Sequence, residues 1–221
     1  MTELSGRVVA VVGATGGLGR EIVARLVDRG AVVVRANRSG GDDDDVVIDL
    51  RDSAAGDALV ATALRLHGRL DGVVVAAGIV AFGDLVDTDD VVMEELFLVN
   101  TLGPMWLAKR VAPALRESQG FFVAITGVVA ESPMPGMAAY SASKAAAAAA
   151  MEAIRREFRR SKVRVIDARP PHTETGLATR PLAGTAPRMP AGLAPTDVAE
   201  RIISAIELEE PIVVPGDFSE S

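Results

Sequence analysis

Near its N-terminus the chain reads Gly13-Ala14-Thr15-Gly16-Gly17-Leu18-Gly19. A valine-rich run, residues 7–12, comes directly before this stretch and is typical of a strand buried on both faces of a parallel sheet. After it, apolar residues recur at helical spacing over residues 21–28, and Gly30 ends the helix. Glycines between a strand and a helix let backbone N–H groups approach a pyrophosphate at the positive end of the helix. We therefore predict a phosphate cradle, with an ordinary glycine-rich turn as the alternative.

Strands and helices alternate along the rest of the chain. Further strands are predicted at residues 31–36, 46–50, 72–76, 121–126, 163–168 and 212–214. Helices are predicted at residues 54–67, 89–118 with an interruption near Gly103-Pro104, 140–160 and 196–208. This alternation predicts one α/β domain over residues 1–221, with a Rossmann fold whose doubly wound parallel sheet carries helices on both faces.

The composition is that of a globular protein and argues against several classes of function. The 221 residues are 49% hydrophobic and 24% charged. A net charge of −7 and an aromatic content of 4% argue against a nucleic-acid-binding module. The absence of cysteine excludes disulfides and cysteine nucleophiles and fits a reducing compartment.

Targeting and metal-binding signals are not found in the sequence. The N-terminus lacks the basic and apolar regions of a signal peptide, and the longest apolar runs have strand length, so we expect a cytoplasmic protein without a membrane helix. His67 and His172 are far apart in sequence, which gives no reason to expect a metal site. The run Asp42–Asp45 is predicted to be a solvated turn, because no glycine-spaced ligand pattern accompanies it.

A long segment without periodicity, at about residues 170–195, is rich in proline, glycine and threonine. Long loops in compact domains are usually functional or mobile, so we predict a flexible substrate flap. His172 lies in this segment and is a candidate polar contact to substrate, with an exposed loop histidine as the alternative.

The end of the second predicted strand bears on the choice between two nicotinamide cofactors. An NAD site usually has a carboxylate there for the ribose 2′-hydroxyl, whereas an arginine accommodates the 2′-phosphate of NADP. The chain has Asn37 and Arg38 at this point. We therefore predict that NADP (NADPH) is favoured over NAD, with a solvated surface arginine as the alternative.

The start of the long helix reads Tyr140-Ser141-Ala142-Ser143-Lys144 and contains the only tyrosine of the chain. Residues four apart share a helix face, so the Tyr140 phenol and the Lys144 ammonium are expected to point the same way. A nearby cation favours the phenolate and lowers its pKa from about 10. Tyr140 is thus a candidate general acid for a carbonyl oxygen, or a base for an alcohol.

With these residues the chain resembles the short-chain dehydrogenase/reductase family over nearly its whole length. The matching pieces are Gly13-xxx-Gly17-x-Gly19, Asp49, Ala77-Gly78, Asn100, Tyr140-xxx-Lys144 and Pro170. The resemblance implies that Tyr140 donates the proton, that Lys144 binds the nicotinamide ribose and lowers the pKa of Tyr140, and that Asn100 holds a relay water. It also implies that Asp49 and Leu50 cap the adenine.

The remaining cofactor contacts implied by the resemblance are Gly13, Thr15, Gly16, Gly17, Leu18, Gly19, Asn37, Arg38, Ala77, Gly78, Pro170, Thr173 and Thr175. The expected partner is a small carbonyl or alcohol substrate. The resemblance further implies a homodimer or homotetramer built on the alanine-rich helix around residues 145–150 and on the helix at residues 100–118.

The chain departs from the family pattern at several positions. Val12 stands where the family usually has threonine, Val75-Ala76 replaces Asn-Asn, and Pro171 replaces the glycine of a Pro-Gly pair. Above all, Gly127 occupies the position of the catalytic serine, thirteen residues before Tyr140. Losing such a donor costs roughly 10²–10³ in rate.

Three residues are candidates to replace that hydroxyl, namely Thr126, Ser132 and His172. Two hypotheses follow. The first is an NADP-preferring oxidoreductase that transfers a hydride between the cofactor and a carbonyl or secondary alcohol. The second is a dinucleotide-binding protein with little or no turnover, acting as a sensor or assembly partner.

Overall fold

The computed structural model describes residues 1–39 and 45–218, so most of the predicted turn Asp42–Asp45 lies outside the described residues. The strands are β1 (Val8–Val12), β2 (Val32–Asn37), β3 (Val46–Val47), β4 (Gly72–Val75), β5 (Phe121–Ile125), β6 (Arg164–Ala168) and β7 (Ile212–Val213). The α-helices are α1 (Gly17–Asp28), α2 (Ala55–His67), α3 (Asp90–Phe97), α4 (Gly103–Ser118), α5 (Ala138–Phe158) and α6 (Pro195–Leu208).

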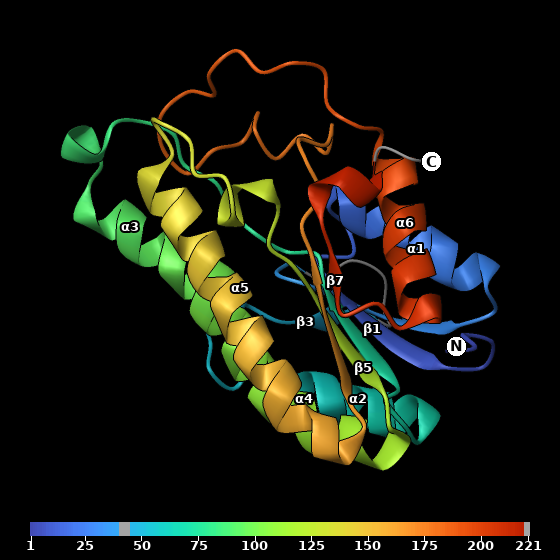
Figure 1. Cartoon of the computed structure of the whole chain (residues 1–221). Coiled ribbons are helices and arrows are strands. Elements are labelled where there is room, and N and C mark those ends of the chain that lie inside the picture. Colours follow the sequence, from blue (N-terminus) through green and yellow to red (C-terminus); the bar gives the residue numbers. More distant parts are fainter. Residues whose placement is uncertain (40–44, 219–221) are drawn as a thin grey trace.

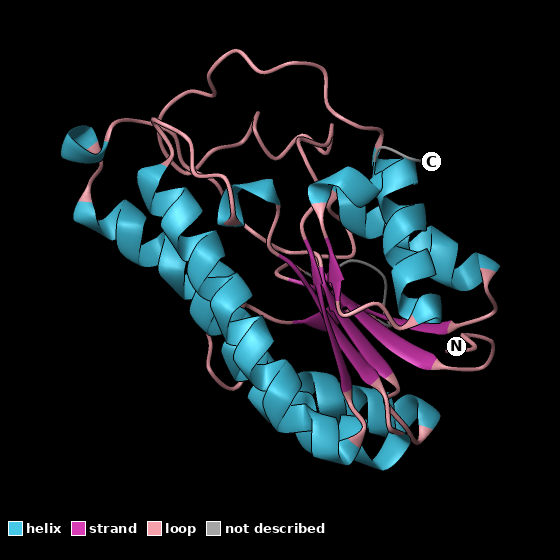
Figure 2. Ribbon diagram, in the orientation of Figure 1, coloured by secondary structure: helices cyan, strands magenta, loops and turns pink. Residues whose placement is uncertain are grey.

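These strands form one parallel sheet in the order β3-β2-β1-β4-β5-β6-β7. The helices α1 and α6 cover one face, and α2, α4 and α5 cover the other (Figures 1 and 2). All five residues of β1 are buried, because the strand alternates its side chains between two apolar layers. The predicted doubly wound α/β fold is confirmed.

Several predicted boundaries are wrong. The third strand covers only Val46–Val47 instead of residues 46–50, and α1 begins at Gly17 instead of residue 21, because the glycine-rich stretch itself forms the first helical turn. The predicted interruption of the long helix is a π-helix at Leu98–Leu102, which lies just before the predicted position at Gly103-Pro104. Pro104 follows the π-helix closely and has no N–H to donate, so the regular hydrogen bonding of an α-helix is interrupted at this point.

The prediction that the chain contains no helix long and apolar enough to span a membrane is also wrong. The continuous helical stretch Asp90–Ser118 has 29 residues and a mean hydropathy of 1.2, enough to cross a membrane by length and composition alone. A helix inside a folded layer passes the same test, and α4 packs against α2 and α5 on the sheet. A Cβ at Gly103 would lie 2.7 Å from the Leu50 carbonyl oxygen, so glycine at this position allows close packing.

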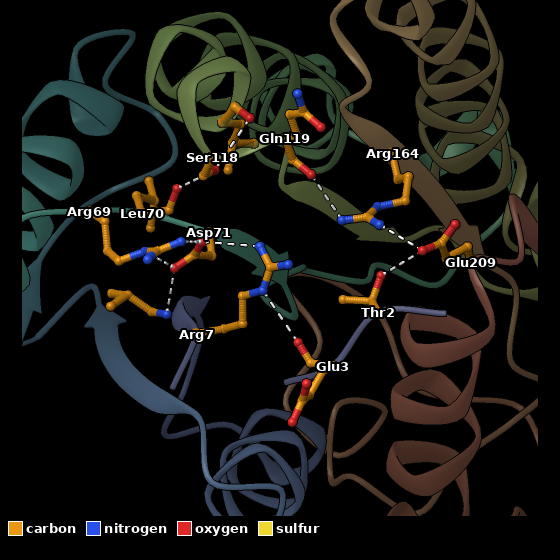
Figure 3. Close-up of polar contacts among 12 residues, drawn as sticks. Thr2, Glu3, Arg7, Arg69, Leu70, Asp71, Ser118, Gln119, Arg164 and Glu209 are labelled. Atoms are coloured by element: carbon orange, nitrogen blue, oxygen red, sulfur yellow. Dashed lines mark hydrogen bonds and ion pairs between the residues drawn. The ribbon is translucent and has the colours of Figure 1, made fainter. Parts of the chain in front are cut away.

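A buried carboxylate joins the beginnings of β1 and β4, at the edge opposite the glycine-rich turn (Figure 3). Asp71 accepts two hydrogen bonds from Arg69, at 2.7 and 2.6 Å, one from Arg7 at 3.2 Å and one from the Val8 N–H at 2.9 Å. Burial by itself raises the pKa of Asp71, but the hydrogen bonds and the two guanidinium charges outweigh burial and lower it. This contact therefore fixes the register at which the central strands start.

We expect Asp71→Ala to lower the free energy of unfolding by roughly 1.5–3 kcal/mol, because the Val8 N–H loses a charged acceptor. Urea unfolding at pH 7 is the measurement, with Asp28→Ala as the control, since Asp28 forms only an exposed pair with Arg25. Because the folded pKa of Asp71 is lowered, its contribution is present above the ordinary carboxyl pKa and is lost as the pH falls through the folded value. Equal effects of the two substitutions would contradict this role for Asp71.

Candidate functional site

Three loops meet at the carboxyl ends of the strands, where the strand order changes direction between β1 and β4. Gly13 has φ +83°, and a Cβ there would lie 2.8 Å from the Ala77 nitrogen. A Cβ at Gly17 would lie 2.4 Å from the Thr175 carbonyl oxygen. The glycine-rich turn thus touches both the loop after β4 and the loop after β6, which brings together residues that are far apart in sequence.

The beginning of α1 has the properties of an anion site. The residue before the helix is Gly16, which supplies no side-chain cap, and the first turn contains no acidic residue. The first N–H groups of a helix have no intrahelical acceptor, and they attract negative charge. These residues therefore fit the pyrophosphate of a dinucleotide, as the sequence predicts.

Asn37 lies at the end of β2, but its side chain is already engaged. Its Oδ1 accepts hydrogen bonds from the Thr15 N–H at 3.0 Å and the Thr15 hydroxyl at 3.1 Å, and its Nδ2 donates to Asp45 at 3.0 Å. Asn37 is also buried, so it holds the glycine-rich turn against β2. Arg38, the next residue, is exposed.

The two residues predicted to contact the adenine have different surroundings. Asp49 is partly exposed and forms an ion pair with Arg51, which lowers the pKa of Asp49. The Leu50 side chain is buried in the core, so only the backbone of Leu50 can reach a ligand. The structure therefore leaves adenine capping as a prediction.

Asn100 lies in the middle of the π-helix, a distortion that is frequent at functional sites. Its side chain exchanges two hydrogen bonds with the backbone of Ile79, at 3.0 and 2.9 Å, and donates to the Ser143 hydroxyl at 3.1 Å. Ser143 in turn donates to the Tyr140 carbonyl at 2.7 Å. Asn100 is thus tied to the helix turn that carries Tyr140, as the sequence predicts for residues of one site.

Lys144 and Tyr140 are both buried side chains of α5, and Tyr140 packs with the loop after β4 and the flap. The Lys144 ammonium donates to the Ile125 carbonyl at 2.8 Å, at the carboxyl end of β5. Burial lowers the pKa of Lys144 to about 8, against the opposing influence of Asp167. Burial also raises the pKa of Tyr140 to about 12, which is opposite to the lowering expected from Lys144.

The predicted flap covers Tyr140. Apart from a single bridge between Thr173 and Leu193, residues 170–194 form no strand or helix. The flap is fixed to the loop after β4 by hydrogen bonds from the Leu182 N–H to the Val80 carbonyl, at 2.7 Å, and from the Phe82 N–H to the Ala183 carbonyl, at 2.9 Å. Four of its apolar residues pack against the cluster that contains Tyr140, namely Leu177, Ala178, Ala183 and Ala186. Figure 1 shows this segment arching over the carboxyl ends of the strands.

The other predicted residues of the flap lie at its base. Pro170 is buried, and its carbonyl accepts from the Val128 N–H at 2.9 Å. The Thr173 hydroxyl donates to the Pro171 carbonyl at 2.9 Å, and the Thr175 backbone lies against Gly17. Ala77 and Gly78 follow β4 directly, and a Cβ at Gly78 would lie 3.3 Å from both the Asn100 Oδ1 and the Lys144 Nζ.

None of the three candidates for the missing serine hydroxyl forms a hydrogen bond to Tyr140 in the described part of the chain. Gly127 has φ +81° and ψ 164°, a conformation that glycine adopts freely and serine only with strain. The Thr126 hydroxyl is buried and hydrogen-bonded to Asp167, so the first candidate replacement is wrong. Ser132 is exposed, and His172 pairs with Glu174 at 3.4 Å in the flap instead of contacting Tyr140.

Sequence reasoning missed two residues that hold the site together. Ser143 links Asn100 to Tyr140, and the Thr101 hydroxyl donates to the Ser143 carbonyl at 2.7 Å. Ser143 and Thr101 are each adjacent to a predicted residue, but the packing of the helices determines which hydroxyl groups point into the protein. A third residue, Asp167, could have been found from the sequence, because it is an acidic residue among the apolar residues Val165, Ile166 and Ala168 of a predicted strand.

The sheet order, the uncapped helix after β1 and the Tyr140–Lys144 pair together define a Rossmann-type α/β protein. Residues 7–183 match the family model for short chain dehydrogenase, and the chain therefore belongs to the short-chain dehydrogenase/reductase family of oxidoreductases.

Relatives and solved structures agree with this membership. The chain is 29% identical to mouse dehydrogenase/reductase SDR family member 7B, over 97% of this chain and 75% of the relative. A short chain dehydrogenase from Burkholderia cenocepacia, solved in complex with NADP, superposes with a TM-score of 0.83 at 25% identity, covering 97% of this chain and 90% of that one. A 3-ketoacyl-(acyl-carrier-protein) reductase from Brucella melitensis, complexed with NADH, shares the fold with a TM-score of 0.84 at 23% identity, over 96% and 97% of the two chains.

The close packing at the glycine-rich turn predicts the effect of a single methyl group. A Cβ at Gly19 would lie 2.1 Å from the Gly13 carbonyl oxygen, whereas a Cβ at Gly216 would meet nothing within 4 Å. We expect Gly19→Ala to lower the free energy of unfolding by about 1–3 kcal/mol, and Gly216→Ala to leave it nearly unchanged. Urea unfolding of both variants checks this, and an equal stability of Gly19→Ala and the wild type would contradict the described packing.

Proposed function

We propose that the protein is an NADP-preferring oxidoreductase that transfers a hydride between a nicotinamide cofactor and a carbonyl or secondary alcohol. The observation that carries the proposal is the position of Tyr140, buried beside Lys144 and tied through Ser143 to Asn100. This group lies at the same edge of the sheet as the glycine-rich turn. The complexes of two similar structures with NADP and NADH support a nicotinamide cofactor.

The protein's own residues would have separate tasks. A bound nicotinamide would supply or accept the hydride. The N–H groups that begin α1 would hold the pyrophosphate, and Lys144 would hold the ribose next to the nicotinamide. Because the pKa of Tyr140 is about 12, its phenol keeps its proton at neutral pH. Tyr140 therefore holds a proton that it would donate to a carbonyl oxygen during reduction.

The cluster around Tyr140 favours a substrate with an apolar body. Met137, Phe82 and Val129 pack with Tyr140, and the flap adds Leu177 and several alanines. A carbonyl compound that replaced part of this packing would bury apolar surface, at roughly 25 cal/mol for each Å². The substrate would thus displace flap residues instead of entering an open polar cleft.

A second function is favoured by a specific observation at Gly127. Neither this residue nor its neighbour Thr126 can present a free hydroxyl to a substrate, and Ser132 is exposed. A dinucleotide-binding protein with little turnover, acting as a sensor or assembly partner, is the alternative that this observation supports.

We also propose a homodimer or homotetramer. The outer side of the α3–α4 layer exposes apolar side chains, namely Val91, Phe97, Leu102 and Met105. Ala142 and Ala149 of α5 are exposed as well and leave a smooth helix surface. Packing against a second copy would remove this apolar area from water.

The preference for NADPH is testable at Arg38. An arginine contact to the 2′-phosphate is charge-assisted, so NADPH should bind roughly tenfold or more tightly than NADH. Arg38→Ala should abolish most of this difference, whereas Arg110→Ala should preserve it, because Arg110 lies on α4 and pairs with Asp57. Isothermal titration with both cofactors is the measurement. Equal affinities in the wild type would rule out the preference.

The acid role of Tyr140 is testable by single-turnover kinetics with bound NADPH and a panel of ketones, aldehydes and quinones. Tyr140→Phe keeps the ring and removes the proton, so the rate should fall by about 10²-fold or more while NADPH binding persists. Lys144→Ala should reduce both the rate and the binding. An unchanged rate in Tyr140→Phe would refute the role.

The same assay distinguishes the two candidate functions. A wild type that binds NADPH but reduces nothing on the panel would favour the binding protein. Gly127→Ser is informative only with its stability measured alongside, because serine at φ +81° costs about 1–3 kcal/mol.

A further inference from the structure

Asp167 is a buried carboxylate that the proposed reaction does not use. It is 4% exposed and lies near the carboxyl end of β6. Burying a carboxylate is costly unless hydrogen bonds and opposite charges compensate. Its nearest counter-charge is Arg169, whose Nε donates to it at 2.8 Å. A carboxylate that is buried in β6 and stabilised by a neighbouring arginine indicates a role beyond packing.

The sheet register places Asp167 under α5. It stands opposite Ala124 of β5, and its neighbours Val165 and Ala124 both pack in the layer formed with α2, α4 and α5. Together with Met151 and Arg155 of α5, Asp167 also lines a cavity of about 10 Å³ between that helix and the sheet. The Asp167 side chain therefore faces the helix that carries Lys144.

One peptide unit separates the contacts of Lys144 from those of Asp167. The Lys144 ammonium donates to the Ile125 carbonyl at 2.8 Å, and the next residue, Thr126, donates its hydroxyl to Asp167. The end of β5 is thus held between a buried cation from α5 and a buried anion from β6. Opposite charges in the protein interior attract each other more than in water, because less water screens them.

We propose that Asp167 is the counter-ion and positioning residue of Lys144, keeping its ammonium charged and directed at the end of β5. Asp167 touches no reacting atom and acts only through Lys144. The catalytic use of Lys144 rests on the proposed function, but the electrostatic coupling of the two side chains does not.

In the described residues, the titratable groups near Lys144 and Asp167 come from α5, β6 and the loop after β5. Besides Lys144, α5 contributes Tyr140, and β6 and the residue after it contribute Asp167 and Arg169. Glu152 and Arg155 of α5 line the cavity beside Asp167. Glu131, which follows β5, pairs with Arg169 at 2.9 Å. The loop after β4 and the π-helix present Gly78 and Asn100, which do not titrate. The opposing effects of burial and of Asp167 on the pKa of Lys144 agree with this arrangement.

The coupling can be measured without any cofactor or substrate. The chain has only three lysines, Lys109, Lys144 and Lys162, so lysine labelled with ¹³C at Cε gives three NMR signals. Lys144→Met assigns the signal of interest, and the other two serve as internal references. In the wild type, Lys144 should titrate with a pKa of about 8.

Asp167→Asn keeps the shape of the side chain and removes its charge. We expect the Lys144 titration to move down by about one pH unit, because the ammonium loses its counter-ion. Arg169→Met should move it up, because Asp167 is then less neutralised. Shifts of opposite sign would not arise from loosened packing alone. Asp71→Asn, which changes the other buried carboxylate of the described residues, should leave the Lys144 titration in place.

An unchanged Lys144 titration in folded Asp167→Asn would overturn the proposal. If Asp167→Asn does not fold, Arg169→Met decides alone, and an unchanged or lowered titration in that variant would overturn it. Because these outcomes are read in the protein alone, they are distinct from a failure of the proposed function, which would show as an absence of NADPH binding or turnover.

Discussion

The architecture of the site depends on contacts between backbone segments that lie too close together to leave room for a side chain. The turn after β1 touches the loop after β4 at Gly13 and the loop after β6 at Gly17. A Cβ at Gly13 would lie 2.8 Å from the nearest backbone atom of the first loop, and a Cβ at Gly17 would lie 2.4 Å from that of the second. These contacts bring three segments separated by up to about 160 residues to one edge of the sheet. The uncapped start of α1, the Ala77-Gly78 loop and the base of the flap therefore face one another only because the chain has glycine at these points.

Much of this arrangement could be predicted because it follows from local patterns. The valine run of β1, the glycine-rich turn and the alternation of strands with helices determine a parallel sheet, and the sheet determines where strand ends meet. Tyr140 and Lys144 were predicted correctly to share a helix face, since four residues span about one turn. Asn100 was predicted from the family resemblance, and the π-helix that presents it leaves no signal beyond the nearby Gly103-Pro104 pair.

What could not be predicted depends on burial and on the direction of single hydroxyl groups. The pKa of Tyr140 was expected to be lowered by a neighbouring cation, but the Lys144 ammonium bonds to a β5 carbonyl and the flap covers the phenol. Desolvation then exceeds any attraction between the two groups. In the same way, the sequence places Thr126 beside the missing serine, but only the sheet register shows that its hydroxyl belongs to Asp167.

Gly127 and Asp167 both affect the site at the carboxyl end of β5, Gly127 from the loop that follows β5 and Asp167 from the neighbouring strand β6. At Gly127 a left-handed backbone conformation stands where the family pattern has a serine. In the proposed reaction, less of the developing charge on a carbonyl oxygen would therefore be met by a neutral donor. At Asp167 a buried anion opposes the effect of burial on the pKa of Lys144. In the proposed reaction, Lys144 and Tyr140 would then carry more of the electrostatics. An ammonium that titrates near neutral pH is a weak fixed charge, whereas one with a buried counter-ion persists over a wider pH range. In a site without the serine hydroxyl, any turnover would therefore depend more strongly on the charge of Lys144 than in relatives that retain that hydroxyl.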